Sequence, residues 1–381
     1  MTKGLYIHIP FCRGRCRYCN FISIPDPAPE VRKGFFECLF NEIDHAHKKY
    51  GRLAFDSLYL GGGTPSFLTV GEITRLINRV RDAFEIGTVA EITFEWNPGD
   101  GDDEKLDLFR VLGVNRVSLG AQSFEDCLLE RLGRRHRAHD TIVTLDKIRR
   151  AGISNISLDL MLRIPGQTHE DFRNSIARAV ELEVSQVSLY DLEVHEETVF
   201  GELKNQNRLD LPAEHVHAAM YGTAISLLES AGYEHYEISN FAKPGFASKH
   251  NLIYWRNGEY LGLGPGSFSY LNGVRCQFAR DMKNYFRKCE AGDWTNDIED
   301  VLTDEEKETE SFAMRLRLSG GVIPADFPAL YPRIGERVRE LLETGFLESA
   351  GDAIRLTAKG KFLPEDVFGF LLQKTETPGI R

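Results

Sequence analysis

The chain has 381 residues and a mass of 43.2 kDa, which suits one large domain with a smaller one rather than a single average domain. Its net charge of −11 argues against a nucleic-acid binder, because contacts with phosphate backbones require a basic surface. An apolar content of 42% excludes global disorder. No apolar run approaches the roughly 18 residues of a membrane-spanning helix. The N-terminus lacks the pattern of a signal peptide, so we expect a cytoplasmic protein.

Short β-rich runs alternate with longer helical patterns in the first 235 residues. Strands are predicted at residues 5–9, 57–60, 91–96, 116–120, 155–161 and 186–192. Helices are predicted near residues 31–43, 73–84, 102–112, 140–151, 169–181 and 213–231. This alternation is typical of parallel strands joined by crossover helices. Six units are too few for a closed eight-stranded barrel, so the predicted fold class is α/β, with a partial (β/α)6 barrel over residues 1–235.

The rest of the chain changes character twice. Residues 236–270 are rich in glycine, proline, asparagine and aromatic side chains, and we expect ordered loop and short strands there. The acidic segment 297–310 is interpreted as a boundary that ends a middle extension, residues 236–296. Beyond it, helical stretches at 312–318 and 334–342 and a hairpin at 346–356 resemble a small winged-helix module, residues 297–381. We interpret this module as a lid or a partner surface.

Seven cysteines in a long chain of this kind do not indicate a disulfide framework. Three of them form a C-x3-C-x2-C motif after the first predicted strand: Cys12, Cys16 and Cys19. Thiolates this close can hold three irons of one [4Fe–4S] cube and leave the fourth iron open. The alternatives are a zinc site with His8 as the fourth ligand, or three unrelated thiols. Three arginines between the cysteines would offset thiolate charge: Arg13, Arg15 and Arg17.

Polar and glycine residues collect at the carboxyl ends of the predicted strands, where a (β/α) barrel places its site. They are Cys12, the sequence GGGTP at 61–65, Glu95, Asn97, Gln122, Ser123 and Asp159. A turn or a solvated strand end would explain any one of these residues. Their recurrence at the same end of successive strands predicts one shared site.

The cysteine motif after the first strand of a (β/α) barrel resembles the radical S-adenosylmethionine (SAM) superfamily. The resemblance implies that the amino and carboxylate groups of SAM chelate the open iron. It also implies that one electron from the reduced cluster cleaves SAM to methionine and a 5′-deoxyadenosyl radical. The sequence GGGTP fits, because backbone without side chains approaches a ligand closely and presents N–H groups to a carboxylate.

Further motifs narrow the resemblance. In order along the chain they are YIHIPFC at 6–12, GGGTP at 61–65, GAQSF at 120–124, LGRRH at 132–136, LDLM at 158–161, IPGQT at 164–168, YEISNF at 236–241, HNLIYW at 250–255 and YLGLGPG at 260–266. Together they resemble the oxygen-independent coproporphyrinogen III oxidase family, and within it the HemW-type haem chaperones. The resemblance covers residue 6 to about residue 270.

The resemblance implies roles for individual residues. Near the cluster-bound SAM it places Tyr6, Gly62 and Glu95, the last suited to the ammonium group or a ribose hydroxyl. It assigns a further set to SAM, partly to a second molecule: Gly63, Thr64, Tyr18, Gln122, Arg134 and Asp159. Arg134 would pair with a carboxylate, and Asp159 with ribose hydroxyls or the sulfonium. For Gln122 and Asp159 the alternative is hydrogen bonding at strand ends.

Two features favour the chaperones over the decarboxylating oxidases. The oxidases carry a further cysteine two residues after the third cluster ligand, where this chain has Phe21. In HemW-type proteins the HNxxYW motif is associated with haem binding, which would make His250 an axial haem ligand. The alternative is that this motif braces a loop against the barrel. At two positions the chain differs from the usual family pattern, which has aspartate in place of Asn20 and histidine in place of Phe268. A divergent radical SAM methylase or cyclase is therefore a further alternative.

The resemblance thus implies a protein with a [4Fe–4S] cluster and SAM that binds haem and delivers it to an acceptor haemoprotein. Its electron donor would be a flavodoxin or a ferredoxin. No nucleic acid and no transmembrane segment are expected, and any membrane contact would be peripheral, through a partner. Three rival activities stand beside this one: oxidative decarboxylation of coproporphyrinogen III, radical C-methylation, and haem degradation by a radical methylase.

Overall fold

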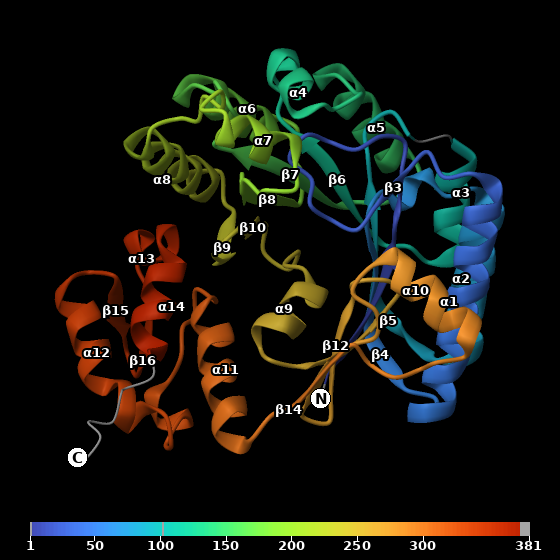
Figure 1. Ribbon diagram of the computed structural model, residues 1–381. Coiled ribbons are helices and arrows are strands. Elements are labelled where there is room, and N and C mark those ends of the chain that lie inside the picture. Colours follow the sequence, from blue (N-terminus) through green and yellow to red (C-terminus); the bar gives the residue numbers. More distant parts are fainter. Residues whose placement is uncertain (1, 101–102, 374–381) are drawn as a thin grey trace.

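A curved sheet forms the centre of this computed structural model, which describes residues 2–100 and 103–373 (Figure 1). Over these residues the sheet has twelve strands, in the order β14-β13-β12-β11-β1-β4-β5-β6-β7-β8-β10-β9. Its middle consists of parallel neighbours: β1 (Lys3–Ile9), β4 (Ala54–Gly62), β5 (Glu85–Trp96), β6 (Arg116–Gln122), β7 (Asn155–Leu162) and β8 (Gln186–Asp191). These are the predicted strands, so the α/β class and the partial barrel are confirmed.

Antiparallel strands extend the sheet beyond β8 and on the far side of β1. They are β10 (Asn240–Ala242) and β9 (Glu234–Glu237) next to β8, and β12 (Phe268–Leu271), β13 (Val274–Gln277) and β14 (Ile298–Val301) beyond β11 (Glu259–Leu263). β11 itself pairs parallel with β1. The middle segment is therefore part of the barrel sheet. The chain leaves that sheet only after β14, which lies inside the segment predicted as a boundary.

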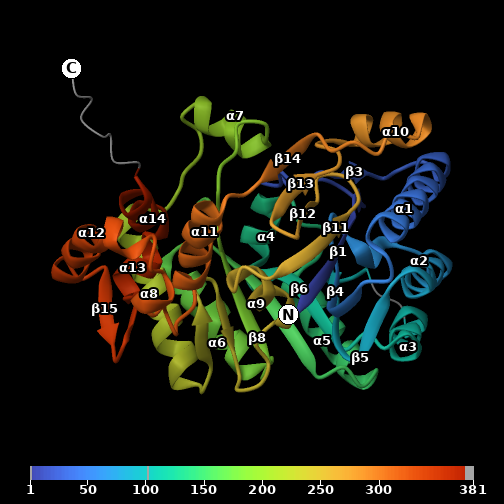
Figure 2. The ribbon, with the colours of Figure 1, turned by 90° about the horizontal axis from the view of Figure 1, so that it is seen from below.

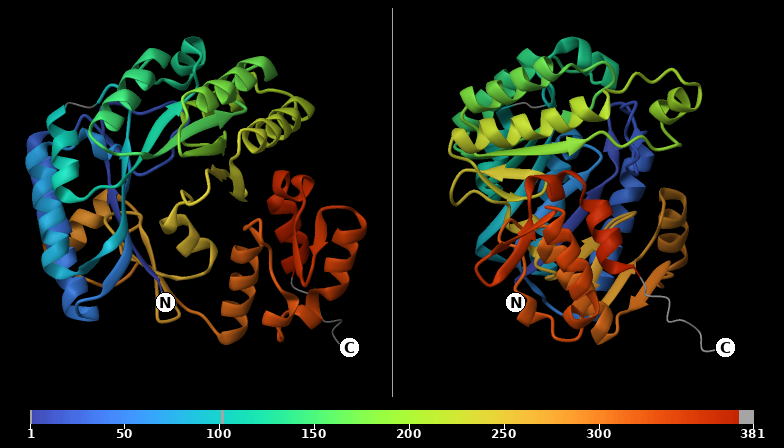
Figure 3. Two further views of the ribbon diagram at one scale, coloured as in Figure 1. Left: turned by 180° about the vertical axis from the view of Figure 1, so that it is seen from behind. Right: turned by 90° about the vertical axis from the view of Figure 1, so that its left-hand side faces the viewer.

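Helices cover the outer face of the sheet (Figures 1 and 3). They are α1 (Pro29–Tyr50), α2 (Val70–Ala83), α3 (Asp103–Leu112), α5 (Ala138–Arg150), α6 (His169–Glu181) and α8 (Glu214–Ser230). Their apolar sides bury Leu39, Ile77 and Ile176 in one continuous core with the strands. The predicted helices are confirmed, although Asp102, the expected first residue of one, lies outside the described residues. Within residues 2–100 and 103–235, two short helices were not predicted: α4 (Asp126–Leu132) and α7 (Val199–Asn205).

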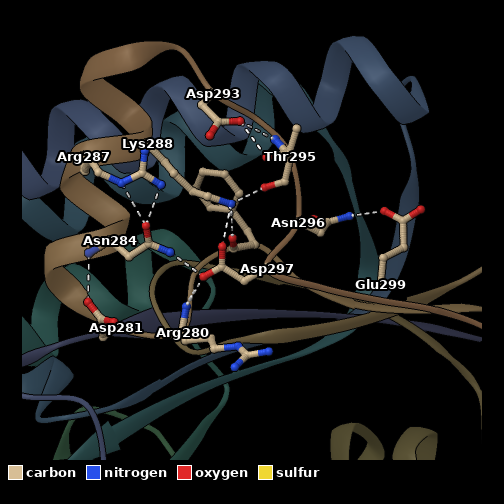
Figure 4. Close-up of polar contacts among 11 residues, drawn as sticks. Arg280, Asp281, Asn284, Arg287, Lys288, Asp293, Thr295, Asn296, Asp297 and Glu299 are labelled. Carbon is tan, nitrogen blue, oxygen red and sulfur yellow. Dashed lines mark hydrogen bonds and ion pairs between the residues drawn. The ribbon is translucent and has the colours of Figure 1, made fainter.

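A buried ammonium group fixes the chain between α10 (Met282–Ala291) and β14 (Figure 4). Lys288 is only 3% exposed and donates to the carbonyl oxygens of Phe278 at 3.1 Å and Thr295 at 2.5 Å. It also pairs with Asp297 at 2.7 Å. α10 lies on α1, so this network attaches the antiparallel edge of the sheet to the helical layer.

The C-terminal module has its own core, which includes Phe312, Val338 and Leu356. Its elements are α11 (Asp304–Leu316), α12 (Tyr331–Glu343), β15 (Leu347–Ala350), β16 (Ala353–Leu356), α13 (Ala358–Phe362) and α14 (Pro364–Leu372). The predicted helices and hairpin are confirmed. α11 contacts α9 (Lys249–Trp255), and Figure 2 shows the two side by side. Over residues 2–100 and 103–373, no helix has the length and apolar character needed to cross a bilayer.

Candidate functional site

The three cysteines of the motif come together at one end of the barrel. Cys12 ends β2 (Phe11–Cys12), which pairs parallel with β3 (Ile24–Pro25) and so closes the loop that carries the other two. Within this loop the Cys19 amide donates to the Cys16 carbonyl at 3.2 Å, which turns the chain. Cys12 is buried and the others are half-buried. All three line one cavity of about 530 Å³.

The surroundings of the cysteines fit a cluster. Thr64 Oγ1 donates to Cys12 Sγ at 3.4 Å, and Arg134 Nη1 donates to Cys16 Sγ at 3.7 Å. Burial raises the pKa of the Cys12 thiol to about 11, so its thiolate requires a metal partner. Within the described chain, no three His, Cys, Asp or Glu side chains converge on a single metal ion. In a cube each cysteine binds a different iron, so a cluster does not require the three sulfurs to converge on one ion.

His8, the fourth ligand that a zinc site would need, is engaged elsewhere. Its Nδ1 lies 3.1 Å from the Tyr6 hydroxyl, and its Nε2 lies 2.8 Å from the Ile22 carbonyl oxygen. The ring is buried, and burial lowers the pKa of this imidazole. Both nitrogens therefore already have hydrogen-bond partners, which removes the basis of the zinc alternative.

The glycine run, which begins in the last two residues of β4, contacts β1 and β2 next to the cysteine loop. A Cβ atom on Gly63 would lie 2.7 Å from the Phe11 carbonyl oxygen, so only glycine allows this approach. Its amide donates to the Ile9 carbonyl at 2.8 Å, and the Thr64 amide donates to the Phe11 carbonyl at 2.7 Å. We expected these amides to face a ligand carboxylate. In the structure these amides instead bind the protein: the Gly63 amide binds the end of β1, and the Thr64 amide binds β2.

Two half-buried carboxylates, Glu95 and Asp159, line the same cavity as the cysteines. Glu95 accepts hydrogen bonds from the Tyr59 hydroxyl at 2.9 Å and from the Gly62 amide at 3.0 Å. Burial raises its pKa to about 7. Asp159 accepts from Ser118 Oγ at 3.1 Å, and burial raises its pKa to about 6, although the charge of Arg116 opposes the shift. Among the described residues neither carboxylate forms an ion pair, so both suit a cationic ligand or hydroxyl groups.

Arg134 organises the wall between the cysteines and the carboxylates. Its Nη2 donates to Asn97 Oδ1 at 2.6 Å and to the Gly120 carbonyl at 2.7 Å. Asn97 in turn donates to Thr64 Oγ1 at 2.9 Å. The guanidinium group is thus held by the protein and by Cys16. No carboxylate of the described residues pairs with Arg134, so the ligand carboxylate expected as its partner would join this network.

The cavity brings together most of the site residues predicted from the sequence. They are Cys12, Tyr18, Gly62, Gly63, Thr64, Glu95, Gln122, Arg134 and Asp159, besides Cys16 and Cys19. It also contains residues that the sequence did not single out: Ser118, Met161 and Tyr190. A two-residue period leads from Asp159 to Met161, whereas an irregular register of β6 between Leu119 and Gln122 breaks the period that would lead to Ser118. Side chains on one face of a strand share one surface.

Tyr6 and His250 lie outside the cavity lining. The ring of Tyr6 stacks on Tyr59 with 6.0 Å between centroids. His250 is only 2% exposed. Its Nδ1 hydrogen-bonds with Ser57 Oγ at 2.8 Å and its Nε2 with the Tyr254 hydroxyl at 2.8 Å. Burial lowers the pKa of this imidazole to about 3. In this arrangement neither nitrogen is available to a haem iron, and the geometry favours the bracing role for the HNxxYW motif.

Glu91 fixes the start of the helix that carries this motif. Its carboxylate accepts from Ser248 Oγ at 3.2 Å, from the Lys249 amide at 3.0 Å and from the His250 amide at 3.1 Å. A carboxylate at the first turn satisfies unpaired amides and complements the helix dipole. Expecting loop and short strands for this segment was wrong at α9, where Ser248 is the N-cap residue.

Of the three arginines expected to offset thiolate charge, Arg15 does so at Cys19, where its charge lowers a thiol pKa that burial raises. No hydrogen bond joins Arg13, Arg15 or Arg17 to a cysteine sulfur in the described part of the chain. Among the contacts of the described residues, Arg13 Nε donates to Asp100 Oδ1 at 2.6 Å and Arg15 Nε donates to the Cys19 carbonyl at 3.3 Å. All three side chains are exposed. The arginine that reaches a sulfur is Arg134, which follows α4, more than a hundred residues later.

Comparison with known proteins gives the family. A sequence model of the Radical SAM superfamily matches residues 6–179. The chain is 37% identical to "Heme chaperone HemW" of Bacillus subtilis, over 97% of this chain and 99% of that protein. The chain belongs to the HemW family of radical SAM proteins. Proteins with that name from Lactococcus lactis and Escherichia coli are 34% and 31% identical, over 96% and 94% of this chain.

A solved structure shares the fold of this chain. The coproporphyrinogen III oxidase HemN of Escherichia coli aligns with a TM-score of 0.83, covering 97% of this chain and 90% of that one. At 23% identity this likeness concerns the fold. The radical SAM family implies a [4Fe–4S] cluster and SAM, and the cavity that joins three cysteines to two half-buried carboxylates fits both.

Proposed function

We propose that the protein binds haem and delivers it to acceptor haemoproteins, with cluster and SAM in the barrel cavity controlling the transfer. The observation that carries this proposal is Phe21, which is 64% exposed and lines the cavity mouth. It stands where the oxidases that the sequence resembles have a further cysteine. Relatives named heme chaperone match the chain over nearly its whole length, which supports the same choice.

The residues of the cavity have separate tasks in this proposal. Cys12, Cys16 and Cys19 hold the cluster, which when bound supplies the electron for SAM cleavage. Glu95 and Asp159 bind the cationic and hydroxyl groups of SAM, because these carboxylates have no cationic partner among the described residues. A flavodoxin or ferredoxin supplies the electron from outside.

The mouth of the cavity offers a surface for a flat macrocycle. Phe21 and Tyr190 both line it and are 64% and 47% exposed. Aromatic faces of this kind stack on planar ligands. His195 also lines the mouth, with its Nε2 3.3 Å from Glu193 Oε2. It is therefore the imidazole that the described cavity presents to a ligand, whereas His250 is buried.

A haem titration followed by absorbance tests the proposal on the protein with cluster and SAM bound. Wild-type protein should bind haem stoichiometrically and pass it to an apo-haemoprotein. His250→Ala and His195→Ala are titrated in parallel, with the exposed His139→Ala as control. Absence of haem binding in the wild type would overturn the proposal. So would carbon dioxide release from coproporphyrinogen III, methylated products or ring opening of haem under the same conditions.

A further inference from the structure

An exposed set of arginines surrounds the outer side of the cysteine loop. We call it the arginine face: Arg13, Arg15, Arg17, Arg131, Arg135 and Arg137. Three of these residues belong to the cysteine loop and three to the end of α4 and the connection to α5. The two segments are held together, because the Arg17 amide donates to the Leu132 carbonyl at 2.9 Å and Arg135 Nη1 donates to the Arg13 carbonyl at 3.2 Å.

This face carries unbalanced positive charge. Arg13 pairs with Asp100 at 2.6 Å, and Arg137 pairs with Asp126 at 3.2 Å. For the other four arginines the described residues provide no ion pair. Asp140 borders the same region. The whole chain has a net charge of −11, so a cluster of six guanidinium groups is opposite in sign to the rest of the protein.

The arginine face also has its own approach to the cluster ligands. A second cavity of about 410 Å³ opens there, and Arg13, Arg135 and Cys16 all line it. Cys16 lines the larger cavity as well. The two cavities meet at Cys16, because both are also lined by Gly14, Thr64, Asn97 and Arg134. This cluster ligand is therefore approached from the arginine face as well as from the larger cavity, and an electron can enter there.

We infer that the arginine face docks the acidic surface of a one-electron donor protein, with its redox cofactor turned toward Cys16. This inference rests on the proposed cluster and extends it to the partner that reduces it. In the electron transfer that follows docking, the donor loses one electron and the cluster gains one, and no covalent bond is made or broken. Complementary charge would steer the encounter and set its orientation.

The test measures binding of an acidic flavodoxin, in its oxidised form, to the protein with its cluster reconstituted. The test variant is Arg17→Glu/Arg135→Glu/Arg137→Glu. The control variant Arg110→Glu/Arg173→Glu/Arg178→Glu has the same change in net charge on α3 and α6. By calorimetry at low salt, the test variant should bind about tenfold more weakly or worse, and the control within about twofold of the wild type. Raising the salt concentration should weaken wild-type binding.

Dithionite separates failure of this inference from failure of the proposed cluster. As a small reductant it does not need the arginine face, so it should reduce the cluster equally in all three proteins, as seen by electron paramagnetic resonance. If the wild type holds no reducible cluster, the proposed function fails. If the cluster is reducible but flavodoxin does not bind, or binds the test variant as tightly as the wild type, the docking inference is overturned.

Two further measurements keep the test decisive. If the Glu variant loses iron, Arg17→Gln/Arg135→Gln/Arg137→Gln removes the charge without reversing it and should still weaken binding. A short single-stranded RNA is titrated as a second polyanion. Arginine-dependent binding of this RNA, with no binding of flavodoxin, would overturn the assignment to an electron donor.

Discussion

The imidazole of His250 stacks on the ring of Tyr59, with 5.0 Å between centroids and 30° between planes. The hydroxyl of Tyr59 then donates to Glu95 inside the cavity. On its other side, α9 ends at Trp255, whose ring lies 4.5 Å from the guanidinium carbon of Arg317. The HNxxYW motif thus links the cavity to the C-terminal module through aromatic contacts.

His250→Ala should lower the free energy of unfolding by about 2–4 kcal/mol, because it removes two buried hydrogen bonds and leaves a void beside Tyr59. It should also weaken SAM binding, since Tyr59 loses its support next to Glu95. Denaturant titration and SAM calorimetry measure both effects. His139→Ala, on an exposed part of α5, should change neither quantity. A His250→Ala protein of unchanged stability would contradict the bracing role.

Gly63→Ala should reduce the iron content after reconstitution, because a methyl group would displace β2 and with it Cys12. Iron and sulfide analysis of the purified protein measures this loss. Gly71→Ala is the matched control, since nothing lies within 4 Å of the added methyl group in α2. This control should keep its iron and gain up to about 1 kcal/mol of stability. Full iron content in Gly63→Ala would show that β2 adapts.

The barrel was predictable because its signals are local. Each helix repeats apolar residues such as Phe35 and Leu39 at the period of one face, and each parallel strand contains a short apolar run such as Leu58 to Leu60. The antiparallel edges were not predictable in the same way. β13 and β14 have few buried residues, and their pairing depends on partners from distant segments.

The free energy of unfolding should fall as the pH rises from 4.5 to about 7, the range over which Glu42 affects stability. Its carboxyl group is 5% exposed and accepts from the Tyr285 hydroxyl at 2.7 Å and the Gly264 amide at 2.9 Å. Burial raises its pKa to about 7 from an ordinary value of 4.5. Between these values the native state binds a proton that the unfolded state has released, so each step up in pH destabilises the fold.

Glu42→Gln removes this titration and keeps an acceptor oxygen. At pH 8 it should be more stable than the wild type by on the order of 2 kcal/mol, and at pH 5 the two should be similar. Urea titration of the protein without cluster at both values measures the difference. An equal difference at pH 5 and pH 8 would show that Glu42 does not titrate in this window.

Lys288→Met should destabilise the protein by about 3 kcal/mol, because Asp297 loses its ammonium partner and two carbonyl oxygens lose their donor. In Lys288→Met/Asp297→Asn the loss should be smaller than the sum of the single changes. Thermal unfolding of the four proteins measures this coupling. Additive losses would mean that the pair in Figure 4 contributes no interaction energy.

Most residues of the candidate cavity were predictable from the sequence, but their contacts were not. The sequence pattern singles out Arg134 and Gly63, yet a pattern does not tell which groups satisfy them. Arg134 binds Asn97 and a carbonyl oxygen, and Gly63 donates to Ile9, because the folded chain offers these partners first. Likewise, His250 belongs to a recognisable motif, whereas its burial depends on Ser57 from β4, far away in the sequence.

The parallel pairing of β1 with β11 has a consequence for synthesis on the ribosome. Lys3 pairs with Glu259, a separation of 256 residues. At typical translation rates the free edge of β1 therefore waits on the order of tens of seconds for its neighbour. During this interval the nascent barrel is open beside the cysteine loop. Slow translation would extend the period in which a cluster-assembly factor reaches the three thiols, and also the exposure to aggregation.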